Sequence, residues 1–454
     1  MRRQRKMLLG AVVRGLPGCI AGWRHKDVSP ETLRGSAGLD YYTHIAAISE
    51  AAKLHFLFLA DSPTVTYLNQ PYMLEHAAQD YYLEPMTMLA AMIPATKHIG
   101  LVGSMSTTYS DPYTVARAFA SLDHLSKGRA SWNIVTTGNP TSAQNYGHDV
   151  HPEKGDRYSR AEEFVRIVKG LWDSWEDDAF LRDQKSGRFL DPSKMHVLNY
   201  KSENFSVRGP LNVERCPQGY PVMLVAGASE RGKELAAETG DALFAAQPDK
   251  AQGQAFYRDV KGRMAKYGRA PEELAILPGA MIIVGETDAE AKEKREYLRS
   301  LIDIEFAVQY TSSLAGMDLS HLPLDKPLPD SLRSQPVWSR LELMLDVAAR
   351  GNLNFRELAI QYTEIYGHQF MVGTPAKIAD ELQDLFENEV ADGFLLRTPI
   401  YPKGLEDTTR LLIPELQRRG LAQTDYPGKT FRENLGLKRP EHPAAAARRG
   451  MAAE

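Results

Sequence analysis

The sequence predicts an α/β fold in which eight strand–helix units close a (β/α)₈ TIM barrel with insertions. Short apolar runs alternate with longer amphipathic segments eight times along the 454 residues. The runs are continuously apolar, as expected of parallel strands that helices cover on both faces. No G-x-G-x-x-G sequence follows any of them, so an open dinucleotide-binding sheet loses its main support. Eight units therefore favour the closed barrel.

Each unit pairs one apolar run with a following helical segment. In chain order the predicted strand and helix ranges are 8–13 and 40–53, 56–60 and 84–97, 99–105 and 112–125, 130–135 and 157–175, 221–226 and 230–239, 242–246 and 248–267, 276–285 and 287–302, and 393–397 and 406–418. Pro112 supports the third helix because proline suits the first helical turn.

The remaining segments define the predicted domain organisation. We expect one barrel domain over 1–425, with insertions at about 176–220 and 303–372, and a partly disordered C-terminal extension over 426–454. The first insertion is polar and turn-rich, with short strands near 195–207. The second contains the Pro-rich string SHLPLDKPLPDSL. That string predicts either a lid over the barrel mouth or a structural strap.

Composition excludes several classes of function. The 54 basic and 58 acidic residues give a net charge of −4, so no broad nucleic-acid-binding surface is expected. Cys19 and Cys216 are the only cysteines and lack metal-ligand spacing. They predict a reducing, cytoplasmic compartment without a cysteine metal site. The apolar run Met7–Val13 is short and is followed by Arg14, which favours a buried first strand over a signal peptide. No apolar stretch approaches the roughly 20 residues that span a bilayer.

The segment after the fifth strand predicts an anion site. The string AGASERGKEL approaches the phosphate-loop pattern G-x-x-x-x-G-K-[ST], but Glu234 replaces the hydroxyl residue that would hold Mg²⁺. An ATPase is therefore disfavoured. A strand, a small-residue turn and a helix start remain, with Ser229 as the candidate N-cap. Helix N-termini bind anions through free N–H groups and the helix dipole. The alternative is that Ser229 only caps its helix.

Small hydroxyl residues and one carboxylate follow the neighbouring strands, at the end of a barrel where ligands bind. Each of them alone is more often a turn or cap residue, but together they suit a polar heterocycle with many donors and acceptors. They are Asp61 after the second strand, Ser104, Ser106, Thr107 and Thr108 at the third, and Thr136 and Thr137 after the fourth.

Few other residues suggest chemistry. Lys154 and Tyr158 begin the long helix near 157–175, where a second phosphate contact could form. His25, His148 and His151 stand in loops, where they either reach the barrel mouth or are solvated. Neither an H-E-x-x-H pair nor a G-x-S-x-G elbow is present. An enzyme without an evident nucleophile or metal site often relies on a cofactor for the difficult step.

Several strings resemble the bacterial-luciferase superfamily over nearly the whole chain. More narrowly, the chain is similar to the reduced-FMN monooxygenases of the nitrilotriacetate monooxygenase component A, pristinamycin synthase and dibenzothiophene-sulfone monooxygenase family. The strings are GWRH (22–25), FLAD (58–61), STTYSDPYTVARAFASLDHLSKGRASWNIVTT (106–137), GDRYSRAEEF (155–164), VRGPLNV (207–213), QAFYRDVKGRMAKYGR (254–269), GTPAKIADE (373–381), ADGF (391–394) and IPELQRRG (413–420).

The resemblance implies a luciferase-like (β/α)₈ barrel that uses FMNH₂ and O₂ to oxygenate a small organic substrate. A separate NAD(P)H:flavin reductase would supply the FMNH₂, and a homodimer or homotetramer is expected. The substrate would be an aminopolycarboxylate cleaved at C–N or an organosulfur compound cleaved at C–S. Two alternatives stay open. One is an F420-dependent luciferase-like oxidoreductase, and the other is a non-catalytic flavin-binding protein.

Site residues also follow from the resemblance. The flavin carries the chemistry, and His25 is the one candidate catalytic side chain. Lys154 departs from the family, whose members commonly have histidine four residues before the tyrosine. A lysine can pair with the flavin phosphate as a point charge, but it lacks the neutral donor–acceptor role of an imidazole. The implied flavin contacts are Asp61, Thr107, Thr137, Lys154, Tyr158 and Ser229.

Overall fold

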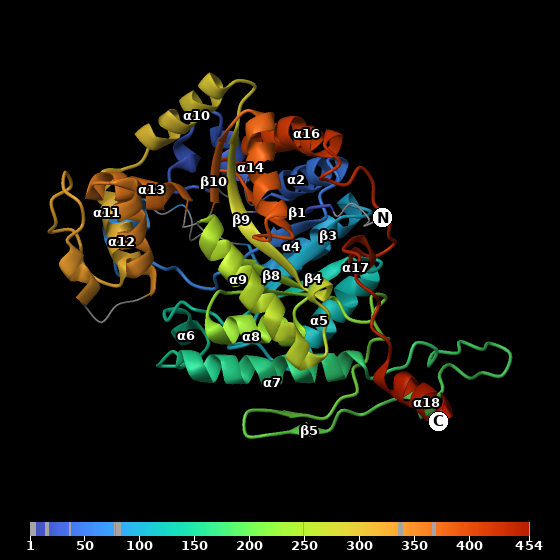
Figure 1. Ribbon diagram of the computed structural model, residues 1–454. Coiled ribbons are helices and arrows are strands. Elements are labelled where there is room, and N and C mark those ends of the chain that lie inside the picture. The colour runs from blue at the N-terminus through green and yellow to red at the C-terminus, as the bar shows by residue number, and fades with distance from the viewer. Residues whose placement is uncertain are drawn as a thin grey trace.

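The computed structural model describes residues 6–13, 18–35, 38–76, 78, 83–247, 249–334, 339–365 and 369–453. Eight parallel strands close a barrel that helices surround (Figure 1). All eight predicted strands are confirmed. In barrel order they are β1 (Leu8–Val13), β2 (Phe56–Leu59), β3 (Gly100–Ser106), β4 (Ala130–Val135), β7 (Val222–Ala226), β8 (Ala242–Ala245), β9 (Ala275–Val284) and β11 (Gly393–Arg397), which pairs with β1.

The strands are apolar on both faces because both faces are buried. Phe56 and Phe58 of β2 point into the barrel, whereas Leu57 and Leu59 pack outward against the helices. All four side chains are at most 4% exposed. Two-sided burial is the physical reason that these runs lack the alternation of a half-exposed strand.

Strand β9 carries an additional neighbour that we did not predict. Its first half, Ala275–Pro278, pairs with β8, and its later residues pair with β11 and with β10 (Gln369–Gly373). The sheet therefore has nine strands, with β10 alongside the barrel. We had placed 369–372 inside the second insertion. The run is short and its residues alternate between half-buried and buried positions, so it lacks the continuous apolar signal of the other strands.

The predicted helices are present, with shifted ends. Asp111 caps α5 by accepting a hydrogen bond from Thr114 N at 3.0 Å, with Pro112 in the first turn. The predicted 84–97 helix changes at Ile93–Ala95 to a 3₁₀ turn that contains Pro94, since proline cannot continue α-helical bonding. The outer helices are α2 (Leu39–Ala51), α4 (Pro85–Met92), α5 (Pro112–Leu125), α7 (Lys154–Trp172), α8 (Glu230–Thr239), α9 (Lys250–Arg263), α10 (Asp288–Ser300), α14 (Pro375–Glu387), α15 (Lys403–Asp407) and, after a π-helical turn, α16 (Ile413–Arg418).

Both predicted insertion regions depart from the barrel repeat. The first contains the antiparallel pair β5 (Tyr200–Lys201) and β6 (Ser206–Val207), close to the predicted short strands. The second contains α11 (Ile304–Ala315), α12 (Ser339–Gly351) and α13 (Phe355–Ile365), which form a lobe beside α10 (Figure 1).

The Pro-rich part of the second insertion packs as a strap. Leu319 and Leu328 are buried in the core of the helical lobe. The carbonyl of Lys326 also accepts a hydrogen bond from Phe355 N at 2.8 Å. These contacts favour the strap over the lid for the described part of 315–335.

The C-terminal segment fills the amino-terminal end of the barrel. Phe431, in the short helix α17 (Phe431–Asn434), is 2% exposed and its ring lies 5.7 Å from that of Phe56. A Cβ at Gly100 would lie 2.5 Å from the Phe431 ring, so this approach requires glycine. This part of the extension is therefore packed against the barrel, and the expected partial disorder of 426–454 stays a prediction. The division into a domain and an extension stays a prediction.

No helix in the described part of the chain is long and apolar enough to cross a lipid bilayer.

Candidate active site

The predicted anion site forms at the carboxyl end of β7. Ser229 caps α8 by accepting a hydrogen bond from Gly232 N at 3.3 Å, as the sequence predicted. Its hydroxyl also donates to the Tyr158 hydroxyl, 3.1 Å away. Tyr158 comes from the first turns of α7 and is 6% exposed. The fold thus joins two predicted residues that are 71 positions apart.

Two glycines leave room around this hydroxyl pair, which we call the anion seat (Tyr158, Gly227, Ser229 and Gly232). A Cβ at Gly227 would lie 3.3 Å from the Tyr158 hydroxyl, and one at Gly232 would lie 3.1 Å from it. Gly227 has φ +154°, which glycine tolerates best. A compact group can therefore approach the backbone N–H groups of the α8 start closely.

Lys233, the lysine of the approximate phosphate-loop pattern, points away from the anion seat. Its ammonium forms an ion pair with Asp259 at 2.5 Å and another with Glu230. This geometry agrees with the prediction that the segment is not an ATP-binding loop.

The hydroxyl residues at the ends of β3 and β4 form a connected rim. Thr137 donates from Oγ1 to Ser106 Oγ at 2.6 Å. Thr107 is fully buried, and its hydroxyl donates to the Val135 carbonyl at 3.2 Å. The Thr107 hydroxyl therefore has only acceptor capacity left for a ligand.

Asn133 adds an unpaired acceptor inside the barrel. Its amide nitrogen donates to Ser104 Oγ at 2.7 Å, but its Oδ1 is buried and has no hydrogen-bond partner among the described residues. An orphaned buried acceptor is costly unless a ligand or water supplies a donor. The sequence analysis did not select Asn133, because asparagine within an apolar strand carries no motif.

Asp61 follows β2 at the same rim. Burial and, to a lesser extent, the nearby charge of Glu84 raise the pKa of its carboxyl to about 6. Burial raises the pKa of Tyr146, and the charge of Asp61 contributes to this rise.

Asp61→Asn is expected to stabilise the flavin-free protein at pH 8. Because the folded pKa is raised, the favourable contribution of the protonated carboxyl is lost as pH rises from about 4 through about 6. After discounting for partial exposure, we expect the substitution to raise the free energy of unfolding by about 1–2 kcal/mol at pH 8. The increase at pH 4.5 should be much smaller. Urea unfolding at both pH values tests this. An equal gain at both would contradict it.

Aromatic and basic side chains that the sequence analysis did not select extend the rim. Tyr109 stacks on Tyr146 with ring centroids 4.7 Å apart. Its hydroxyl is 2.6 Å from His151 Nδ1. Arg157 contacts His151 Nε2 and donates to the Thr137 carbonyl at 2.8 Å. His151 therefore reaches the mouth, one of the two possibilities that the sequence left open.

Two predicted residues make no such contacts. Lys154 is the first residue of α7 and is exposed, and its side chain forms no hydrogen bond or ion pair within the described chain. His25 is 5% exposed and packs edge-on against Tyr297 of α10, 4.9 Å between ring centroids. Its Nδ1 accepts from Asp27 N at 3.1 Å. Neither contact directs His25 to the anion seat, and the catalytic role of His25 stays a prediction.

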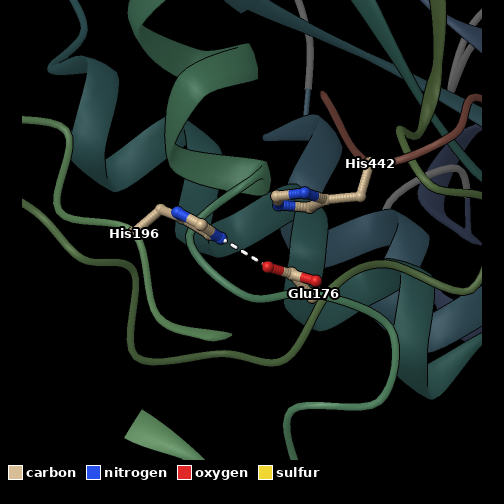
Figure 2. Close-up of side chains that lie close together, drawn as sticks. All are labelled: Glu176, His196 and His442. Atoms are coloured by element: carbon tan, nitrogen blue, oxygen red, sulfur yellow. Dashed lines mark hydrogen bonds and ion pairs between the residues drawn. The ribbon is translucent and has the colours of Figure 1, made fainter. Parts of the chain in front are cut away.

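A separate cluster joins the first insertion to the C-terminal segment. Glu176, His196 and His442 have ligand-type atoms within 4.8 Å of one another (Figure 2). The Glu176 carboxylate already pairs with Arg448 and with His196. His442 Nε2 donates to the Asp173 carbonyl, and its Nδ1 accepts from the backbone. These bonds hold the C-terminal segment in place and leave no lone pair of His442 for a metal ion.

The fold and the rim together define a class of protein. A closed barrel with an anion seat, a hydroxyl-rich rim and an orphaned acceptor at its carboxyl end is typical of enzymes that bind a phosphorylated cofactor. The sequence model of the luciferase-like monooxygenase family matches residues 21–392. The chain belongs to this family, and it is a flavin-dependent monooxygenase.

Three relatives illustrate the similarity. Nitrilotriacetate monooxygenase component A of Aminobacter aminovorans is 45% identical, covering 93% of this chain and 95% of that protein. N-acetyl-S-(2-succino)cysteine monooxygenase of Bacillus subtilis is 44% identical, covering 96% and 98%. The crystal structure of a riboflavin lyase with modified FMN and riboflavin is 31% identical, with a TM-score of 0.85 and coverage of 97% and 99%.

Proposed function

We propose that this chain is the oxygenase component of a two-component system that uses FMNH₂ and O₂. The observation that carries the proposal is the anion seat, in which the Tyr158 and Ser229 hydroxyls meet at the start of α8. A phosphate fits there because the helix dipole and the free N–H groups favour an anion. The two glycines leave space for it.

The chain's own residues would bind and orient the cofactor. Tyr158 and Ser229 hold the phosphate, and Lys154, at the start of α7, supplies a counter-charge. Asp61, Thr107 and Thr137 contact the ring system from the ends of β2, β3 and β4. The orphaned Oδ1 of Asn133 accepts from a ring N–H. Reduced FMN, when bound, supplies the activation of O₂, and the barrel walls exclude water from the reacting atoms.

We propose a substrate in which carbon is bonded to nitrogen or sulfur. Two relatives support this, because one is named for a tertiary amine and the other for a thioether. Oxygenation of the carbon next to the heteroatom would lead to cleavage of the C–N or C–S bond. The FMNH₂ would come from a separate NAD(P)H:flavin reductase, and the chain would assemble as a homodimer or homotetramer.

Product formation is expected to need every component of the system. Nitrilotriacetate and a succinylated cysteine thioether would be incubated with the enzyme, a generic flavin reductase, NADH, FMN and air, and products followed by mass spectrometry. Omitting FMN, reductase or O₂ should each reduce product to background. Normal yield from NADH alone would refute the proposal. Oxidation of reduced F420 in preference to FMNH₂ would instead support the F420-dependent alternative.

A further inference from the structure

A cavity of about 320 Å³ opens between the turn after β3 and the start of α7. We call it the mouth cavity. Two of its lining side chains are anchored to predicted flavin contacts. Arg157 donates to the Thr137 carbonyl at 2.8 Å, and Arg160 donates to the Thr107 carbonyl at 3.1 Å. The cavity therefore adjoins the site where the flavin ring is proposed to lie. Its lining includes Thr108, Tyr109, His148, Arg157, Arg160 and Asn204.

The two guanidinium groups are cations without an acidic partner. Within the described residues neither forms an ion pair, whereas Arg231, which also contacts α7, is paired with Glu162 at 2.7 Å. Burial lowers the pKa of both Arg157 and Arg160. Partly buried cations are normally paired, because desolvation penalises an isolated charge. The missing counter-charge indicates an anionic ligand.

The acidic residues nearby do not fill that role. Asp156 lines the cavity, but its side chain is exposed and forms no ion pair within the described chain. Glu163 accepts hydrogen bonds from Tyr200 at 3.0 Å and from Asn204 at 2.9 Å, and it forms no ion pair with either arginine in the described part of the chain. The two arginines therefore outnumber the one acid of the lining.

Two buried polar atoms also lack partners here. Thr108 is 6% exposed, lines the cavity, and its Oγ1 has no hydrogen-bond partner among the described residues. Arg157 Nε is buried and equally unpaired. A hydroxyl and a guanidinium N–H are both donors that a carboxylate oxygen would satisfy.

We propose that the mouth cavity is a subsite for a carboxylate group of the substrate, bound by Arg157, Arg160 and Thr108. This inference rests on the proposed function and specifies the substrate class as carboxylate-bearing. A phosphate has similar chemistry, and the flavin phosphate is the other possible source of an anion. The separate anion seat at Ser229 and Tyr158 favours the carboxylate. Arg157 contacts His151 and Thr137, and Thr137 is a proposed contact of the flavin ring and not of its phosphate. This position of Arg157 also favours a substrate carboxylate over the flavin phosphate.

Arg160→Gln tests the subsite by binding, without turnover. The protein would be saturated with oxidised FMN and titrated calorimetrically with nitrilotriacetate and, separately, succinate in metal-free buffer. Arg160→Gln should weaken binding of both at least tenfold. Arg166→Gln is the matched control, because it removes the same charge from an exposed position on α7. It should change affinity less than twofold. Thr108→Val should weaken binding about threefold and covers the case in which Arg160→Gln fails to fold.

Three results would overturn the subsite. The first is wild-type protein that binds neither compound, and the second is equal weakening by the two arginine variants. The third is an Arg160→Gln variant that binds nitrilotriacetate as the wild type does but binds FMN more weakly than it binds riboflavin. That result would assign the cavity to the flavin phosphate. Binding through Arg160 in a protein that forms no product would leave the subsite standing and refute the proposed function.

Discussion

Ser229→Asp is expected to weaken FMN binding about a hundredfold. The new carboxylate would stand next to the bound phosphate at the start of α8. Like charges about 4 Å apart near a protein surface repel by about 4 kcal/mol before salt screening, so about 2.7 kcal/mol, or a hundredfold, should survive. Aspartate is as good an N-cap as serine, so α8 should be preserved. Quenching of flavin fluorescence on titration measures the affinity.

Ser229→Asn is the matched control for this prediction. Asparagine has nearly the same shape as aspartate and also caps helices well, but it is neutral. Ser229→Asn should change the affinity for FMN by no more than about fivefold. Riboflavin, which lacks the phosphate, should bind both variants alike. FMN binding equally to both variants would show that the phosphate lies elsewhere in the barrel.

Arg432→Met is expected to lower the free energy of unfolding by about 3–5 kcal/mol. Arg432 forms a two-pronged ion pair with Asp241 at 2.9 and 2.7 Å, and the two side chains are only 5% and 9% exposed. Removing one partner leaves an uncompensated buried charge, which costs about that much. The backbone of Arg432 also donates to Gln218 at 2.9 Å. Chemical denaturation of the flavin-free protein measures the change.

Arg418→Met provides the comparison. Arg418 pairs with Glu415 at 2.7 Å but its side chain is 70% exposed, and exposed pairs contribute less than about 1 kcal/mol. If Arg432→Met lowered the free energy of unfolding no more than Arg418→Met does, the C-terminal segment would not be stabilising the amino-terminal end of the barrel. Asp241→Asn in the Arg432→Met background should recover part of the loss, because it removes the unpaired charge.

Local sequence signals predicted the elements well. Continuous apolar runs located all eight barrel strands, and the N-cap role of Ser229 and the first-turn position of Pro112 are confirmed. These features depend on neighbours within about four residues, so local sequence contains the needed information. The second-insertion strand β10 was missed because its burial depends on pairing with β9, which is distant in the sequence.

The packing of the C-terminal extension against the barrel was missed for a similar reason. Phe431 is buried because Gly100 opens a space in β3 and Phe56 lies beside it. Arg432 is buried because Asp241 precedes β8. The composition of a short segment does not reveal partners that lie far away in the sequence, so this packing could not be predicted from residues 426–454 alone.

The sequence by itself determined the barrel, the order of its units and the carboxyl-end position of the candidate site. Only the tertiary structure decided that Tyr158 meets Ser229 and that His25 packs against α10. Only it showed that Arg157 and Arg160 line the mouth cavity and have no ion-pair partner within the described ranges. The physical reason is range: helix caps and strand periodicity are fixed by residues a few positions apart. Contacts between strand ends depend on barrel closure and on the side chains that share the remaining space.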